Sequence, residues 1–99
     1  MIPTDAAYVW NGFYIRNDML PAIRRYIEHG MLPGDFLQAV ICNDLTEACG
    51  RADDENMKNL GAYVAYFYNE VPRVCWGSKE RMQAWNAHKT QVGAEGGAG

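Results

Sequence analysis

An Asn-Gly pair between two short runs of β-favouring residues constrains the fold of this 99-residue chain more than any other feature. The runs are residues 8–10 (Tyr-Val-Trp) and 13–15 (Phe-Tyr-Ile), and the pair between them is Asn11 and Gly12. A type I′ turn needs positive φ at both central residues, which Asn-Gly adopts readily, so the sequence predicts a β-hairpin. A two-residue turn also fixes the register. The expected cross-strand pairs are Trp10 with Phe13, Val9 with Tyr14, and Tyr8 with Ile15.

A hairpin of this length is only marginally stable on its own, so one of its faces must pack on something else. Successive side chains of a strand point to opposite faces, which leaves Val9 and Tyr14 on one side. The other face carries four apolar or aromatic side chains: Tyr8, Trp10, Phe13 and Ile15. We expect this face to pack either on helices of the same chain or on another subunit.

The remainder of the sequence has the periodicity and the flanking residues of helices. Asp18, Asp53 and Ser78 are suited to cap helix starts, and Gly30 suits the left-handed position at a helix end. The expected helices cover residues 19–29, 34–49, 54–70 and 79–88. The predicted fold class is therefore mainly α: a compact bundle of about four helices with a short N-terminal β-hairpin.

This bundle is expected to form a single globular domain over residues 1–89. The Gly- and Ala-rich segment 90–99 has the composition of a disordered tail. The longest expected helix repeats apolar residues at three- and four-residue intervals, a seam suited to packing on another helix. The seam consists of Met57, Leu60, Val64, Phe67 and Val71.

Charge and composition exclude several classes of protein. The net charge is −3, and no Lys or Arg occurs from Tyr26 to Gly50, so a DNA-binding helix-turn-helix in this region is rejected. No apolar run approaches the length of a membrane span, and residues 1–5 lack the pattern of a signal peptide. The three cysteines, Cys42, Cys49 and Cys75, form no C-x-x-C pair, so we expect free thiols and a cytoplasmic location.

Catalytic and metal-binding signatures are missing from the sequence. It contains no G-x-S-x-G, H-E-x-x-H or Walker motif, and His29 and His88 lack the spacing of metal ligands. We therefore expect a protein that is not an enzyme and that uses no cofactor and no metal ion.

One candidate ligand site lies on the first helix. An arginine pair beside aromatic rings can grip a phosphate or carboxylate and stack on a base. The residues expected in such a site are Arg24, Arg25, Tyr26, Tyr63 and Tyr66. The alternative is a solvated helix face whose arginines pair with Glu28 and neighbouring acids. Asp44 is a second ambiguous residue: it is exposed at the boundary of the apolar face, or it is satisfied by a cap, an arginine or a ligand. Pairing with an arginine, Arg24 or Arg51, is the expected role, and contact with a ligand is the alternative.

Twelve aromatic rings are more than the core of so small a domain can hide. Some rings are therefore expected to touch a partner, which is a host protein or a small nucleotide-type ligand, and the chain is expected to form a homo-oligomer. The rings expected at an interface are Tyr8, Trp10, Phe13, Tyr14 and Tyr68. For the tyrosines near the end of the third helix, core packing with hydroxyls that reach water is an equal alternative.

Residues 19–85 resemble a family of small proteins encoded in bacteriophage and prophage genomes. The resemblance rests on the segments RRYIEHG, PGDFLQAVICNDL, RADDEN and VPRVCWGS, and covers about two thirds of the chain. No activity is established for that family, so no functional residue is carried over. The segment YVWNGFYI departs from the family pattern.

The resemblance implies a phage accessory protein that acts in the cytoplasm of a bacterial host. Our hypothesis is a non-enzymatic binding protein that blocks or sequesters a component, a protein or a nucleotide signal, of a host defence or regulatory system. The alternative is a structural, assembly or regulatory phage protein whose aromatic surface serves only oligomerisation. A small enzyme without a recognisable motif is the third possibility.

Overall fold

The computed structural model describes residues 2–98, with side chains up to residue 91. Its elements follow one another as β1 (Tyr8–Trp10), β2 (Phe13–Ile15), η1 (Asn17–Met19), α1 (Leu20–His29), α2 (Asp35–Ile41), α3 (Leu45–Arg51), α4 (Asp54–Lys58), α5 (Leu60–Glu70), η2 (Arg73–Cys75) and α6 (Lys79–Ala98). The fold is mainly α with one antiparallel hairpin near the N-terminus, as the sequence predicts.

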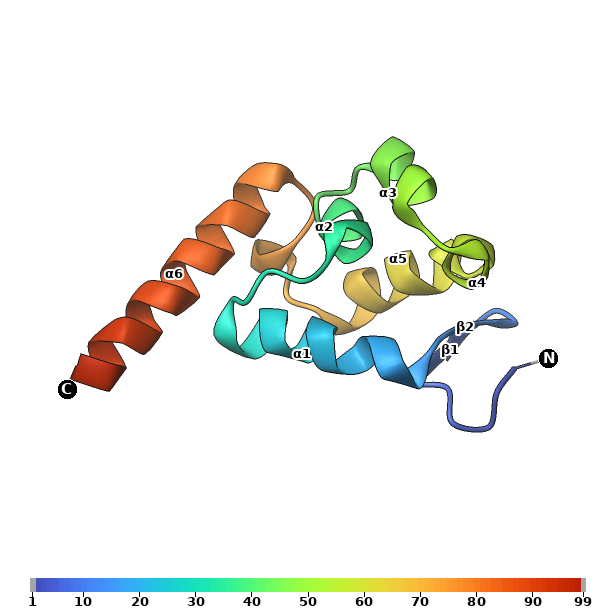
Figure 1. Ribbon diagram of the computed structural model, residues 1–99, viewed down its shortest axis with the longest axis horizontal. Coiled ribbons are helices and arrows are strands. Elements are labelled where there is room, and N and C mark those ends of the chain that lie inside the picture. Colours follow the sequence, from blue (N-terminus) through green and yellow to red (C-terminus); the bar gives the residue numbers. More distant parts are fainter. Residues whose placement is uncertain (1, 99) are drawn as a thin grey trace.

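The helices enclose one core (Figure 1). Helix α5 runs through the middle of the molecule, with the hairpin packed at one end, while α6 lies at the opposite end against α1. The fully buried side chains come from both ends of the chain and from the middle: Ile15, Ile23, Tyr26, Ile41, Tyr63, Phe67 and Cys75. Within the described residues, no helix is both long enough and apolar enough to cross a membrane.

The hairpin has the predicted register, with Trp10 opposite Phe13 and Tyr8 opposite Ile15. Both turn residues have positive φ, 51° at Asn11 and 83° at Gly12, as a type I′ turn requires. Part of the predicted inner face packs on α5 of the same chain. The Tyr8 ring meets the Tyr66 ring edge-on at 5.2 Å between centroids, and Ile15 is fully buried.

Helix α1 ends at Gly30, which adopts the predicted left-handed conformation with φ 72°. The prediction that Asp18 caps the start of this helix is wrong. The 3-10 turn η1 runs directly into α1, so Asp18 already lies in helical backbone, and its carboxylate pairs with the Arg16 guanidinium at 3.3 Å.

Two helices that the sequence predicts as continuous are each divided in two. Asn43, with φ 59°, ends the first part of the 34–49 segment, and Asp44 then caps α3 by accepting a hydrogen bond from the Glu47 amide at 3.1 Å. Asn59 separates α4 from α5 in the segment 54–70. Short polar side chains bond locally to the backbone and so compete with helix continuation. Asp53 caps α4 as predicted, accepting from the Asn56 amide at 2.7 Å.

Helix α6 begins where the sequence predicts, because the Ser78 hydroxyl accepts a hydrogen bond from the Arg81 amide at 3.1 Å. It extends to Ala98, past the expected end at residue 88. The predicted disorder of residues 90–99 stays a prediction, because the side chains from residue 92 onward lie outside the described part.

Candidate functional site

All twelve aromatic rings lie in the described part of the chain, and they divide into three groups. Four are buried: Tyr26, Phe36, Tyr63 and Phe67. Five are partly buried: Tyr8, Tyr14, Tyr66, Trp76 and Trp85. Trp10, Phe13 and Tyr68 are exposed, at 40%, 42% and 65% of their surface. All three exposed rings are among the predicted interface residues.

Two of these rings, Trp10 and Tyr68, line an open groove with a cavity volume of about 590 Å³. Trp10 comes from β1 and Leu45 from α3, while α5 supplies the rest. The lining residues include no charged side chain: they are Trp10, Leu45, Leu60, Gly61, Val64, Ala65, Tyr68 and Asn69. We call the exposed large apolar and aromatic side chains of this lining, Trp10, Leu45, Val64 and Tyr68, the apolar face.

The apolar face arises because the residues of the predicted helical seam do not all lie on one buried helix face. Phe67 and Val71 point into the core, whereas Val64 is 41% exposed and Met57 is 47% exposed. The break at Asn59 separates Met57 from the axis of α5. Leu45 is 65% exposed because it begins a new helix, α3, instead of continuing the buried side of α2. The sequence analysis therefore did not predict that Leu45 is an exposed residue of this face. The signal that could have indicated it is the Asn43-Asp44 pair, which breaks the helix just before Leu45.

The hairpin borders the apolar face with a strand edge. In an antiparallel pair that is not hydrogen-bonded, each residue turns its N–H and C=O away from the other strand. Val9 and Tyr14 form such a pair, since the Tyr14 amide points outward to Asn59 Oδ1 at 2.9 Å. Val9 accordingly turns its own amide and carbonyl to the outer edge of β1. Within residues 2–98, no hydrogen bond to a side chain, turn or loop engages these two groups.

The other edge of the hairpin is closed. Asn59 is only 5% exposed and accepts from the Tyr14 amide while it donates to the Glu55 carbonyl at 2.8 Å. The Tyr14 hydroxyl also hydrogen-bonds the Glu55 carboxylate. Tyr14, which the sequence places at an interface, thus has its amide and its hydroxyl engaged within the chain.

An ion-pair cluster lies beside this closed edge. The Arg16 guanidinium contacts Asp53 at 3.0 Å, Glu55 at 3.1 Å and Asp18 at 3.3 Å. Hydrogen bonds from Tyr14 and then Arg16 lower the pKa of the Glu55 carboxyl. The Asn56 amide, followed by Arg16, lowers the pKa of Asp53. These groups bond to one another, so the cluster anchors the hairpin to α4.

The residues of the predicted ligand site do not come together on the surface. Tyr26 is fully buried and its hydroxyl donates to the Cys75 carbonyl at 2.5 Å. Tyr63 is also fully buried and donates to Asn56 Oδ1 at 2.7 Å. Burial raises the pKa of both phenols. Neither side chain reaches the surface, so the expected five-residue site does not form.

The other three residues of the predicted site are Arg24, Arg25 and the partly buried Tyr66. Both arginines are exposed on α1, and no ion pair involves them within residues 2–98. Glu28, the expected pairing partner, lies 3.9 Å from His29 instead. Tyr66 is close enough to Arg24 for the positive charge to act on its phenol, although burial is the larger effect and raises the pKa of Tyr66.

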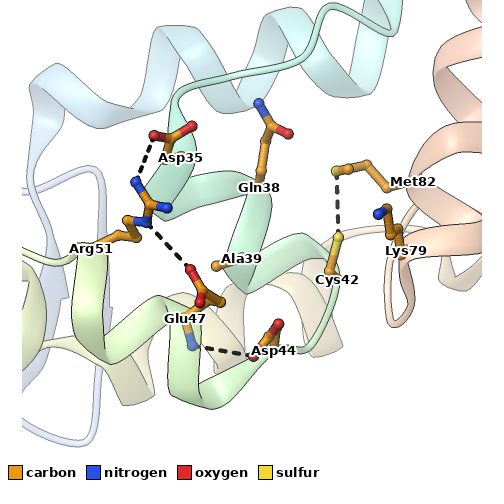
Figure 2. Close-up of a pocket in the computed structure, with 9 residues that line it drawn as sticks. All are labelled: Asp35, Gln38, Ala39, Cys42, Asp44, Glu47, Arg51, Lys79 and Met82. Atoms are coloured by element: carbon orange, nitrogen blue, oxygen red, sulfur yellow. Dashed lines mark hydrogen bonds and ion pairs between the residues drawn. The ribbon is translucent and has the colours of Figure 1, made fainter.

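A second, polar pocket of about 290 Å³ opens between α2, α3 and the start of α6 (Figure 2). Arg51 bridges Asp35 at 3.1 Å and Glu47 at 3.3 Å, and these ion pairs cross one side of the pocket. Asp44 faces the same pocket but pairs with neither Arg24 nor Arg51, because its carboxylate caps α3. That corrects the expected pairing of Asp44 with an arginine.

The other side of the pocket carries sulfur. The Cys42 thiol lies 3.6 Å from the Met82 thioether, and Lys79 stands beside them (Figure 2). Burial raises the pKa of Cys42, which keeps it protonated and weakens it as a nucleophile. In the described part of the chain, no three His, Cys, Asp or Glu side chains gather as a metal site. The pocket therefore offers the ion pairs of Arg51, the charged side chains of Asp44 and Lys79, and a thiol that is a weak nucleophile.

Fold and surface together define the chain as a small, mainly α-helical protein with an N-terminal hairpin and an uncharged apolar groove beside an open strand edge. No protein-family model, no curated protein and no solved structure matches it.

Proposed function

We propose that this chain is a non-enzymatic binding protein that contacts another protein through the apolar face. One observation carries the proposal: Trp10 and Tyr68, exposed by 40% and 65%, flank a groove whose lining has no charged side chain. Protein interfaces concentrate their binding energy in aromatic anchors at an uncharged centre.

The size of the exposed surface supports this role. Single exposed apolar residues are ordinary, whereas a contiguous patch of some hundreds of Å² is typical of an interaction site. Trp10 and Tyr68 are joined by Leu45 and Val64 in one continuous lining, at 65% and 41% exposure. The polar pocket beside Cys42 fits an interface core less well, because five charged side chains line it: Asp35, Asp44, Glu47, Arg51 and Lys79.

The setting of the proposal comes from the sequence resemblance. A phage-encoded chain in the cytoplasm of a bacterial host would block or sequester a component of a defence or regulatory system by occupying its surface. A chain of 99 residues with a ready contact surface suits such a role, since occupation needs no catalytic group.

Phage plating tests the proposal. In a bacterial strain that restricts phage growth, expression of the chain should raise the plating efficiency. The double variant Trp10→Ser, Tyr68→Ser should lose this effect because it removes the two aromatic anchors. Val74→Ser is the matched control, since Val74 is 60% exposed in η2 and does not line the groove. Full activity of the double variant, with the fold intact by circular dichroism, would refute a role for the apolar face.

A nucleotide-type signal is the second candidate ligand, favoured by the exposed Arg24 and Arg25, which enter no ion pair within the described residues. Two guanidinium groups, with the Tyr66 ring near Arg24, suit a phosphate and an aromatic base. Thermal unfolding with a panel of cyclic and linear nucleotides tests this. A ligand at 100-fold above its Kd should add about 2.7 kcal/mol to the free energy of unfolding.

The matched pair for that experiment is Arg24→Ala with Arg25→Ala against Lys58→Ala, an exposed cation on α4. Only the arginine variant should lose the stabilisation. If no nucleotide in the panel changes the wild-type melting temperature, the nucleotide proposal is refuted. The apolar face then remains as the contact surface, either for a foreign protein or, in the alternative hypothesis, only for assembly of the chain with itself.

A further inference from the structure

We infer that a second copy of this chain covers the apolar face, joined to the first by antiparallel pairing of β1 with β1 about a two-fold axis at Val9. The inference rests on the proposed function, because it uses the same face and names the protein that binds there. Three observations carry it: an open strand edge, a self-complementary set of side chains, and a neutral surface.

The open edge supplies the geometry. Val9 turns both its amide and its carbonyl away from β2, and these two groups are free within the described residues. A two-fold axis beside Val9 sets it opposite Val9 of the partner subunit. The two residues then exchange a pair of N–H···O=C bonds, which is the hydrogen-bonded pair of an antiparallel ladder. Asn59 occupies the other edge of the hairpin, so β1 alone is available for this pairing.

The pairing also matches the side chains. With Val9 at the axis, Tyr8 comes opposite Trp10 of the partner subunit, and the reverse pair forms by symmetry. Tyr8 and Trp10 lie on the same face of the strand, toward α5, where Tyr8 contacts Tyr66 and Trp10 contacts Gly61. Aromatic pairs across antiparallel strands stabilise a sheet.

The available area fits a small dimer. At their observed exposures, Trp10 and Tyr68 alone leave roughly 200 Å² of surface uncovered. Leu45 and Val64 extend this surface at 65% and 41% exposure. A standard interface buries about 800 Å² per partner, of which the apolar centre is only a part. Two hydrogen bonds from β1 fix the orientation, and the apolar contact supplies most of the binding energy.

Charge favours a second copy over a charged foreign partner. Each copy has a net charge of −3, so two copies repel except where they meet through neutral surface. Residues 6–15 contain no charged side chain, and neither does the groove lining. The contact region thus brings no like charges into direct contact when two copies meet, and it offers no ionic complement to an acidic or basic protein.

Light scattering and sedimentation equilibrium of the full chain test the inference. The wild type should be a dimer at micromolar concentration. Val9→Pro removes the amide hydrogen at the open edge, where the hairpin does not use it, and should raise the dimer Kd about tenfold or more. Val9→Thr keeps the amide and the β-branched shape, so it should remain dimeric. Tyr68→Glu places one carboxylate per copy in the groove and should also give monomers, which covers the case of a misfolded proline variant.

Cysteine cross-linking tests the register. Two Val9 residues that form a hydrogen-bonded pair have Cα atoms about 5.5 Å apart, within the range of a disulfide. Val9→Cys should therefore form a covalent dimer under mild oxidation. Gln83→Cys, exposed on α6, should give no more cross-linking than the wild type with its three native thiols.

Every outcome of these experiments either supports or overturns the inferred dimer. A wild type that stays monomeric at high concentration, or a dimer that Val9→Pro and Tyr68→Glu both leave intact, overturns the inference. So does a Val9→Cys chain that cross-links no faster than Gln83→Cys. A monomer whose activity in plating still depends on Trp10 and Tyr68 would refute the dimer and leave the proposed function standing with a foreign partner. A dimer without any effect on plating would refute the function and leave the dimer.

Discussion

The Trp10 indole lies directly against the backbone of Gly61, where a Cβ atom would come within 3.2 Å of Trp10 Cζ3. This contact is the close approach that joins the hairpin to α5 and builds one wall of the groove. A side chain of any size at position 61 must displace the ring. Gly61 thus links the stability of the hairpin to the shape of the apolar face.

Gly61→Leu should lower the free energy of unfolding by about 1–3 kcal/mol, because the new side chain forces Trp10 away from α5. Urea denaturation measures the loss, and near-ultraviolet circular dichroism reports the ring. Gly50→Leu is the control: it also places leucine in a helix, but nothing lies within 4 Å of its Cβ position. Equal stability of the two variants would contradict the contact.

Gly30→Ala should destabilise the chain more than Gly12→Ala. Both residues have positive φ, 72° and 83°, so each alanine meets the same backbone strain of roughly 1 kcal/mol. Only at Gly30 would the added Cβ also lie 2.6 Å from Lys89 Cβ, where α6 crosses the end of α1. Thermal unfolding of the two variants measures the difference. Identical melting temperatures would mean that α6 does not approach Gly30 this closely.

Tyr26→Phe should cost about 1–3 kcal/mol, because it leaves the buried Cys75 carbonyl without the hydroxyl that it accepts from at 2.5 Å. Equilibrium unfolding in urea measures this cost. Tyr68→Phe removes a hydroxyl from a residue that is 65% exposed and should change the stability by less than about 0.5 kcal/mol. A reversed order would show that Tyr68, not Tyr26, has the structural hydroxyl.

Acid should weaken the anchor between the hairpin and α4. The ordinary pKa values of Glu55 and Asp53 are 4.5 and 3.8, and folding lowers both. A carboxyl whose pKa is lower in the folded state stabilises the fold fully above its ordinary pKa, and this stabilisation is lost as the pH falls through the lowered value. Urea midpoints should therefore fall as the pH drops below about 4.5.

Arg16→Gln is the matched variant for that titration, since it removes the shared cation of the cluster while keeping a polar side chain. The stability gap between Arg16→Gln and the wild type should be widest at neutral pH and narrow in acid. A gap that is constant from pH 7 to about pH 3 would contradict the role of Glu55 and Asp53 as its partners.

The local features of the fold were predictable because they depend on near neighbours. Asn11-Gly12 determines its turn and the register of the strands, and Gly30, Asp53 and Ser78 act at helix ends through bonds within a few residues. Asn43 and Asn59 were harder to interpret. Each side chain stabilises a break, yet the apolar periodicity continues across both positions, so periodicity alone predicts a single helix.

The surface was predictable only in part, because burial depends on which elements meet. That some rings must remain exposed follows from their number, and Trp10, Phe13 and Tyr68 are exposed. Tyr26 and Tyr63 have the same residue type but lie in the core, where Cys75 and Asn56 satisfy their hydroxyls. No local signal distinguishes a tyrosine with a distant buried acceptor from one that faces solvent.

The side chain of Asn59 has a consequence for solubility. A hairpin with two free borders can add strands on both sides, and such a template grows without limit into a fibre. By occupying the Tyr14 amide, Asn59 removes one direction of growth, so the proposed association through β1 would stop at a dimer. One buried amide would thereby separate a chain that pairs from a chain that aggregates.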